Sequence, residues 1–417
     1  MKDKQESIDR RSFLKAVGAA GLGSVLASPD TIGASKETPD AQEPELPQVP
    51  KRKLGKTGVE IPVLSLGTMF NLVDSQLVLR STLKYGVTYW DTANVYAGGN
   101  SELGIGKFLE KNPQMRNQLF IVTKAKRAYT KDAMEKCLQL SLDRMKTDHV
   151  DLHYFHDLQD PALLTDEIRK YAESAKKRKL IRFFGLTTHS NIPKCLLAGA
   201  KLDWIDVIMT RYNFRTMQDP QMQAAIDACH RANIGLVAMK TTGKTTIKRF
   251  KKAIETEAEK KMVEHFLNRG FTPEQACIKL ALQDKRFSSA CVQMENVNIL
   301  KTNVAAVLDK TELTRQDMDI LAEYAQLTSG SYCAGCAHIC DAALPETLRP
   351  GRICDIMRYL MYHNSYGDSA AARDLFAQIP SRVRSTLLSI DYDPAEARCP
   401  QRLPIRKLVA EAVTKLA

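Results

Sequence analysis

Four ionisable side chains in the first half of the sequence could act together on one oxygen atom: a carboxylate, a phenol, an amine and an imidazole. They are Asp91, Tyr96, Lys124 and His156. A phenol titrates near pH ~10 and is a poor proton donor at neutral pH unless its pKa falls. A buried ammonium beside it would lower that pKa, the carboxylate would keep the amine charged, and the imidazole could hydrogen-bond the same oxygen. Such a set would polarise a carbonyl group while hydride arrives from a cofactor.

A scaffold for these groups is indicated by short β-rich runs that alternate with longer amphipathic stretches. Most of the runs are continuously apolar, which is typical of strands buried on both faces. Helical patterns between them include 132–145 and 221–232. Eight such units in roughly 250 residues predict an α/β fold, the TIM (β/α)₈ barrel. A doubly wound sheet is the alternative, but no Gly-x-Gly-x-x-Gly turn follows the first strand. The expected strands are 63–67, 87–91, 119–124, 150–156, 181–187, 207–210, 235–240 and 289–292.

The expected strands place the four groups at one end of the barrel, where TIM barrels carry their chemistry. Asp91 ends the second strand, Lys124 the third and His156 the fourth, while Tyr96 lies in the loop after the second. The leading segment 52–61 is expected to form a hairpin that closes the opposite, N-terminal end.

Residues 52–306 resemble the aldo-keto reductase family. The resemblance is carried by Asp-Thr-Ala at 91–93 with Tyr96, by Ser-Glu-Leu-Gly at 101–104, by Thr-Lys at 123–124, and by the strand ending at His156. It implies a barrel, NADPH as the usual cofactor, reduction of aldehydes or ketones, and Asp91, Tyr96, Lys124 and His156 as the catalytic groups.

The same resemblance implies a set of cofactor-binding positions. Three positions depart from the family pattern: Thr188 replaces an Asn, Met209 a Gln and Gln293 a Gly. No clear pair of residues for a 2′-phosphate is present, so NADP(H) and NAD(H) both stay open. The departures motivate an alternative function, a periplasmic iron–sulfur electron-transfer or binding protein on a barrel that has lost nicotinamide use. The expected cofactor-binding residues are Thr187, Thr188, Tyr212, Asn213 and Asn303.

Cysteines gather in the last part of the chain. Cys333, Cys336 and Cys340 form a C-x-x-C-x-x-x-C cluster, and a remote Cys-Pro stands at Cys399. Three close thiolates plus a remote Cys-Pro match the ligands of one [4Fe–4S] cluster, with Cys354 as the rival fourth ligand. The Cys-Pro-Gln-x-x-Pro-Ile run resembles ferredoxin-like tails on one branch of the family.

Two other uses of these thiols stay open. One is a structural zinc site with His338 as an extra ligand, and the other is disulfide bonds. The remaining five cysteines stand singly and are interpreted as core residues.

The N-terminus resembles a twin-arginine signal, with Arg-Arg-Ser-Phe-Leu-Lys at 10–15 and a mildly apolar run at 16–27. Cleavage is expected after Ala27 or Ala34. This route exports folded proteins, which suits a chain that loads its cofactor first, and it predicts a periplasmic or extracytoplasmic location with the export machinery as a partner. The expected domains are the signal at 1–27, a Pro-rich tether at 28–50, the barrel at 51–310 and a helical iron–sulfur segment at 311–417.

Composition limits the partners. The formal net charge is +12, but Lys and Arg are scattered along the chain, which disfavours nucleic acid binding. No run reaches the ~18 apolar residues of a membrane span, so none is expected after signal cleavage. The expected partners are a small carbonyl or alcohol substrate, whose identity the sequence does not indicate, and a redox partner for the cluster.

Overall fold

The computed structural model describes residues 46–244, 257–346 and 352–417. The expected signal at 1–27 and most of the expected tether therefore lie outside the described residues. Within the described part of the tether, Gln48 and Val49 contact the barrel: the Val49 amide donates to the carbonyl of Tyr85, and the Gln48 side chain donates to that of Lys84.

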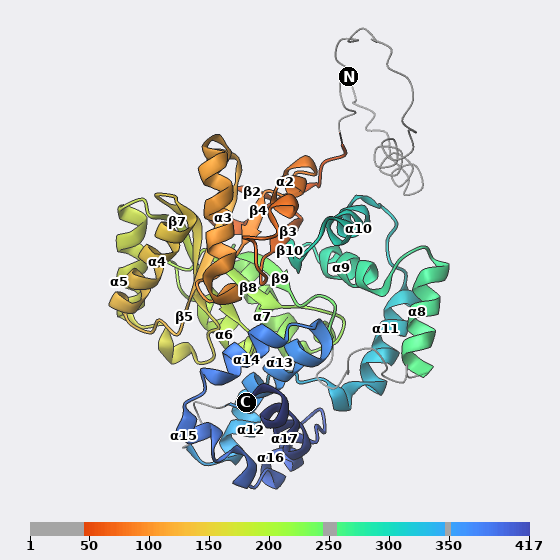
Figure 1. The fold of residues 1–417 in the computed structure, drawn as a ribbon. Coiled ribbons are helices and arrows are strands. Elements are labelled where there is room, and N and C mark those ends of the chain that lie inside the picture. Colours follow the sequence, from red (N-terminus) through yellow and green to blue (C-terminus); the bar gives the residue numbers. More distant parts are fainter. Residues whose placement is uncertain (1–45, 245–256, 347–351) are drawn as a thin grey trace, which may run out of the picture.

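Eight parallel strands close into a barrel in which the last strand pairs with the first (Figure 1). This confirms the predicted TIM-type fold. The strands are β3 (Leu64–Gly67), β4 (Tyr89–Asp91), β5 (Phe120–Lys126), β6 (Val150–His156), β7 (Ile181–Thr188), β8 (Val207–Arg211), β9 (Gly235–Met239) and β10 (Phe287–Gln293). Except for 150–156, the expected strands differ from the observed ones by one or two residues at one or both ends. The difference that matters for the site is in β5, which continues two residues beyond Lys124, because Lys126 still pairs with His156 of β6.

Helices surround the barrel and follow its strands in sequence. Side-chain caps set the first turn of some of them: the hydroxyl of Thr130 accepts from the Ala133 amide at the start of α4, and Thr272 and Gln275 form a capping box at the start of α9. The helices are α2 (Gln76–Lys84), α3 (Asn100–Lys111), α4 (Lys131–Met145), α5 (Asp166–Lys177), α6 (Ile192–Gly199), α7 (Pro220–Arg231), α8 (Glu257–Asn268), α9 (Pro273–Gln283) and α10 (Val297–Leu308). The patterns at 132–145 and 221–232 correspond to α4 and α7.

The barrel has an inner core and an outer core, as strand alternation requires. On β5, Phe120 and Val122 pack inside the barrel, whereas Ile121 and Ala125 pack against the surrounding helices. By the same alternation Lys124 and Lys126 lie on the inner face, at the carboxyl end of the strand.

The expected hairpin is present as β1 (Lys51–Lys53) paired antiparallel with β2 (Glu60–Pro62). Leu54 and Ile61 are buried among the inner residues of the barrel. Gly55 has a φ of +50°, and a Cβ there would lie 2.2 Å from the Gly235 nitrogen at the start of β9. Only glycine fits this close approach, so the hairpin closes the N-terminal end.

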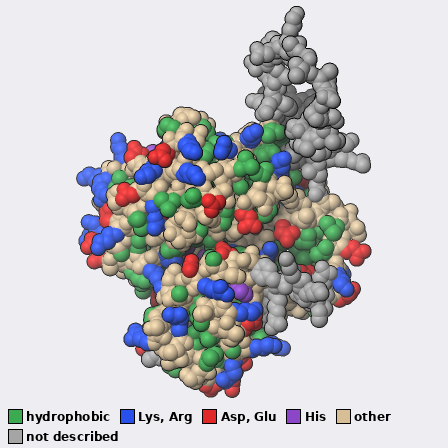
Figure 2. Space-filling model, in the orientation of Figure 1, with side chains coloured by type: hydrophobic (Ala, Val, Ile, Leu, Met, Phe, Trp, Pro, Cys, Tyr) green, Lys and Arg blue, Asp and Glu red, His purple; other side chains and the backbone are tan. Residues whose placement is uncertain are grey.

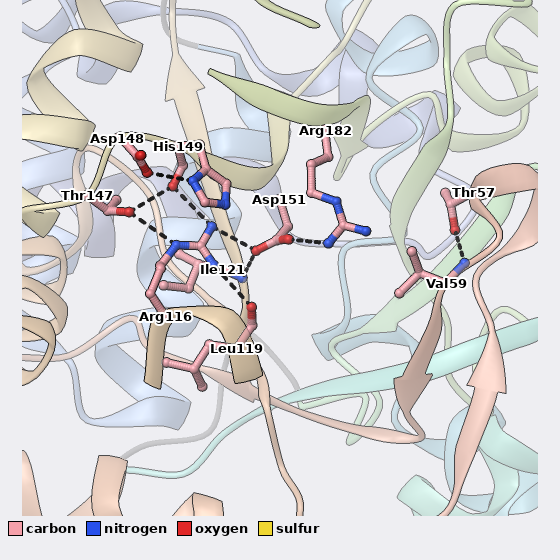
Figure 3. A network of polar contacts seen from close by, with 10 residues as sticks. All are labelled: Thr57, Val59, Arg116, Leu119, Ile121, Thr147, Asp148, His149, Asp151 and Arg182. Atoms are coloured by element: carbon pink, nitrogen blue, oxygen red, sulfur yellow. Dashed lines mark hydrogen bonds and ion pairs between the residues drawn. The ribbon is translucent and has the colours of Figure 1, made fainter. Parts of the chain in front are cut away.

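A buried carboxylate ties several strands together near that end (Figure 3). Asp151 of β6 accepts from the Ile121 amide of β5 at 2.9 Å and from Arg116 at 3.0 Å and Arg182 at 2.6 Å. Arg116 also donates to the carbonyls of Leu119 and His149. This network is structural and lies away from the carboxyl ends of the strands.

The tail is helical, as expected. Helix α11 (Arg315–Leu327) packs against α8, and the later helices gather over one end of the barrel around their own apolar core (Figure 1). They are α12 (Ala337–Cys340), α13 (Ile353–Met361), the π-helical turn η8 (Tyr362–Tyr366), α14 (Ser369–Ala377), α15 (Ser381–Arg384), α16 (Asp393–Arg398) and α17 (Ile405–Leu416). The division between barrel and tail at residue 310 stays a prediction.

The surface of the molecule carries both signs of charge, with Lys and Arg side chains spread over the face shown in Figure 2. None of the helices among the described residues is both long enough and apolar enough to span a membrane.

Candidate active site

Asp91 and Lys124 form a buried ion pair between β4 and β5. The Lys124 ammonium contacts the Asp91 carboxylate and donates to the carbonyl oxygen of Thr92 at 2.7 Å. Only 1% of the Lys124 side chain and 4% of the Asp91 side chain are exposed. Because each charge lies in a dry environment, the pair fixes both side chains in one arrangement.

Tyr96 lies above this pair, in the short helical turn η2 (Tyr96–Gly99) that follows β4. Its hydroxyl is 3.4 Å from the Lys124 Nζ. The turn continues through Gly99, whose φ of +99° favours glycine. Arg144 supports the turn by donating to the Asn94 carbonyl at 2.7 Å and to Glu102 at 3.1 Å.

Glu102, from the Ser-Glu-Leu-Gly segment, is fully buried and accepts from the Thr123 hydroxyl of β5 at 2.6 Å. It therefore joins the Tyr96 turn to the strand that carries Lys124. This gives the segment a positioning role.

His156 ends β6 and faces Tyr96. The two rings meet edge to face, with centroids 5.9 Å apart and an interplanar angle of 80°. Burial lowers the pKa of His156 well below its usual value, and the nearby charges of Lys124 and Lys126 lower it further. His156 is therefore neutral at pH 7 and can hydrogen-bond an oxygen without carrying charge.

The protonation of Tyr96 differs from the expectation. Burial raises the pKa of the phenol well above its usual value, and the Asp91 carboxylate raises it further. The expected lowering by Lys124 was wrong for this structure, because the ammonium is already neutralised by Asp91 and the phenol itself is desolvated. Tyr96 thus keeps its proton at neutral pH and is available as a donor.

Three of the expected cofactor-binding residues make hydrogen bonds within the protein. Thr187 accepts from the Asp157 amide at 2.8 Å, and Thr188 donates to the Ser190 carbonyl at 2.9 Å. Asn213 donates to the Lys240 carbonyl at 2.9 Å. These groups are engaged within the protein, so their binding role stays a prediction.

Tyr212 and Asn303 lie elsewhere. Tyr212 stacks on Phe287 with centroids 4.3 Å apart, its hydroxyl donates to Asp284 at 2.5 Å, and it packs in the outer core. Asn303 is buried on α10. Both roles stay predictions.

A cavity lies between the segments that follow β7, β8 and β9 and the tail, and its lining includes the expected cofactor residue Asn213 but none of the four groups. Its lining includes Ser190 after β7, Arg211 at the end of β8, and Lys240 and Lys244 after β9. The buried Ser190 hydroxyl oxygen has no hydrogen-bond partner among the described residues. A free hydroxyl and three cations are donors that suit the amide and diphosphate of a dinucleotide.

The tail packs on the barrel at this same mouth. Arg358 of α13 donates to both oxygens of Asp157, just after β6, at 3.0 and 2.7 Å. Arg211 donates to the Cys333 carbonyl at 2.9 Å. Lys126, which was missed from the sequence, is signalled only by its spacing of two from Lys124 on the same strand.

The cysteines of the tail lie near one another. Burial raises the pKa of Cys333 to about 11, and the neighbouring Cys336 and Cys399 add to the rise. Helix α12, which ends at Cys340, packs against α16, which precedes Cys399. All ten cysteines are free thiols. Across 46–244, 257–346 and 352–417, no three His, Cys, Asp or Glu side chains converge tightly enough to hold a metal ion.

Comparison with known proteins agrees with the barrel fold described above. The sequence profile of the Aldo/keto reductase family matches residues 64–326, which include all eight barrel strands and all but the last residue of α11. The match ends before the cysteine tail.

Two curated relatives illustrate the range of similarity. An L-galactose dehydrogenase of Arabidopsis thaliana is 25% identical over 291 residues, covering 64% of this chain and 90% of the relative. The L-glyceraldehyde 3-phosphate reductase of Escherichia coli K12 is 29% identical over 161 residues, covering 34% of this chain and 46% of the relative.

Two solved structures share the barrel. The thermostable aldo-keto reductase Tm1743 has a TM-score of 0.54 at 26% identity, covering 66% of this chain and all of that one. The aldo-keto reductase AKR11C1 from Bacillus halodurans has a TM-score of 0.55 at 19% identity, covering 66% of this chain and 96% of that one.

Proposed function

Because this chain belongs to the aldo/keto reductase family and is an NAD(P)-dependent oxidoreductase acting on carbonyl compounds, we propose that Tyr96, Lys124, Asp91 and His156 are its catalytic set. One observation carries the proposal: the Tyr96 hydroxyl lies 3.4 Å from the Lys124 ammonium and edge-on to His156. The alternative of a barrel without nicotinamide use finds no support in the family match.

Each side chain has a separate task in this proposal. Tyr96, which keeps its proton at neutral pH, donates it to the carbonyl oxygen as negative charge develops there. The Lys124 ammonium stabilises the phenolate left behind, and Asp91 holds the ammonium in place. Neutral His156 hydrogen-bonds the same oxygen and orients the substrate. The nicotinamide supplies hydride when it is bound.

For the cofactor, we propose Thr187, Thr188, Tyr212, Asn213 and Asn303 as binding residues on the strength of the family resemblance. The cations Arg211 and Lys240 and the Ser190 hydroxyl, which line the cavity between the strand ends and the tail together with Asn213, add suitable donors. Titration of the protein with NADPH and with NADH decides between the two cofactors.

We also propose one [4Fe–4S] cluster on Cys333, Cys336, Cys340 and Cys399, in a segment beginning near residue 311. Mutual electrostatic effects among these thiols support it. The thiols do not converge on one point, and a four-iron cluster holds its thiolates farther apart than a single ion would. Cys354 is the rival ligand: burial raises the pKa of its thiol well above the usual value, and Cys333 and Cys340 are among the neighbours that add to the rise.

Export by the twin-arginine route to the periplasm is likewise a proposal. It rests on the 10–27 segment and on the proposed cofactors, which need loading before transport. The division into signal (1–27), tether (28–50), barrel (51–310) and tail (311–417), and a redox partner for the cluster, belong to the same proposal.

The catalytic proposal is tested with Tyr96→Phe and the matched control Tyr129→Phe, whose side chain is at the surface (47% exposed). Reduction of a generic aldehyde should fall by roughly 10²–10⁴ in Tyr96→Phe and persist in the control. NADPH and NADH affinities, followed by tryptophan quenching, should be unchanged in both variants. Full aldehyde reduction by Tyr96→Phe would contradict the assigned role.

A further inference from the structure

Lys126 is a second lysine at the mouth of the barrel. It lies two residues after Lys124 on β5 and therefore on the same face of the strand. It is the last residue of β5, and its Cα is paired in register with that of His156 on β6. Neighbouring strands are ~4.8 Å apart. The Lys126 side chain therefore starts beside that of His156 on the inner face of the barrel, and its ammonium extends toward Tyr359 of α13.

The Lys126 ammonium has no acceptor of its own. In the described part of the chain no carboxylate lies within ion-pair distance of it, and its one recorded contact is the Tyr359 ring, 5.9 Å from Nζ to centroid. Burial lowers the pKa of Lys126 to about 8; Arg358 and Arg127 also lower it, while Asp157 and Asp355 raise it.

The two carboxylates that act on Lys126 are already bound to other groups. Asp157 accepts two bonds from Arg358, and Asp355 accepts from Arg358 at 2.8 Å and from Gln159 at 2.9 Å. A half-buried cation without an acceptor in the protein is less well solvated than one at the surface. An anionic group of a ligand would supply that acceptor.

We infer that Lys126 is a specificity residue that binds the carboxylate of a small oxo acid whose carbonyl meets Tyr96 and His156. The inference rests on the proposed function and names its substrate class. Because Lys126 and His156 start from paired positions, the carboxylate stands next to the carbonyl, as in a 2-oxo acid. In the reaction the carbonyl carbon gains hydride from NAD(P)H and the oxygen gains the Tyr96 proton, giving a 2-hydroxy acid and NAD(P)⁺.

The test compares glyoxylate with methylglyoxal, a neutral carbonyl compound of similar size, using the purified full-length protein. Lys126→Met should lower kcat/KM for glyoxylate by roughly 10- to 100-fold, the value of a hydrogen bond to a charged group, and barely change it for methylglyoxal. Lys126→Arg should retain most of the glyoxylate activity. Lys177→Met, at an exposed lysine on α5, should change neither.

Equal losses for both compounds in Lys126→Met would overturn the inference, while reduction of methylglyoxal would leave the proposed function standing. If Lys126→Met lowered kcat/KM more for glyceraldehyde 3-phosphate than for glyoxylate, the inferred carboxylate ligand would be wrong and Lys126 would bind a phosphate instead.

If the protein reduces no carbonyl compound, the proposed function fails. The carboxylate-binding role of Lys126 is then tested separately by the binding of oxamate. Calorimetry should then show oxamate binding that Lys126→Met weakens by at least roughly tenfold. Absent or unchanged binding of oxamate would overturn the subsite.

Discussion

Replacing Arg358 by Met is expected to loosen the tail from the mouth of the barrel. Arg358 bonds to Asp157 and Asp355, and the side chains are only 9%, 7% and 14% exposed. Removing one partner of a buried ion pair leaves an uncompensated charge and typically costs about 3–5 kcal/mol. The free energy of opening the tail should fall by that amount, roughly a hundredfold or more in population.

Hydrogen exchange of the α13 and α17 amides measures this opening directly. Exchange should accelerate in Arg358→Met. It should largely recover when Asp157 and Asp355 are also replaced by Asn, because no buried charge is then left. Asn suits position 157, where φ is +65°, since it adopts left-handed backbone readily.

A matched control is Arg406, which also bonds two carboxylates, Asp391 and Asp393, but at the surface. These side chains are 52%, 67% and 75% exposed. Arg406→Met should leave exchange unchanged, because water already solvates these charges. Unchanged exchange of α13 in Arg358→Met would refute the reasoning about the buried pair.

Three further predictions follow from other features. Above pH about 8, kcat/KM for glyoxylate should fall because Lys126 loses its proton, whereas kcat/KM for methylglyoxal should not; parallel pH profiles would contradict this. Leu54→Ala should lower the free energy of unfolding in urea by about 2–5 kcal/mol, because Leu54 is fully buried where the hairpin closes the barrel; exposed Leu77→Ala is the control. Cys340→Ser should remove iron, sulfide and the broad visible absorbance, while Cys137→Ser should retain them; stoichiometric zinc in the native protein would instead exclude the cluster.

The barrel could be predicted because its strands are buried on both faces and therefore appear as continuous apolar runs. The run at 150–156 coincides with β6. The end of β5 was missed because a lysine at position 126 is typical of a loop. A lysine can lie on the inner face there because the position is at the open end of the barrel. A charged residue at a strand end therefore obscures where the strand stops.

The meeting of Asp91, Tyr96 and Lys124 could be expected from strand order alone. The direction of the Tyr96 pKa could not, because it depends on how deeply the phenol is buried and on the neutralisation of Lys124 by Asp91. Arg358 could not be anticipated either, since it lies 201 positions from Asp157. Contacts this distant follow from the packing of the tail and leave no periodic pattern in the sequence.

The closure of the barrel mouth by the last helices has a consequence for biosynthesis. All eight strands leave the ribosome before α13 is made, so the nascent barrel stands open until Arg358 emerges and reaches Asp157. A nucleotide taken up in that interval would be enclosed when the tail docks.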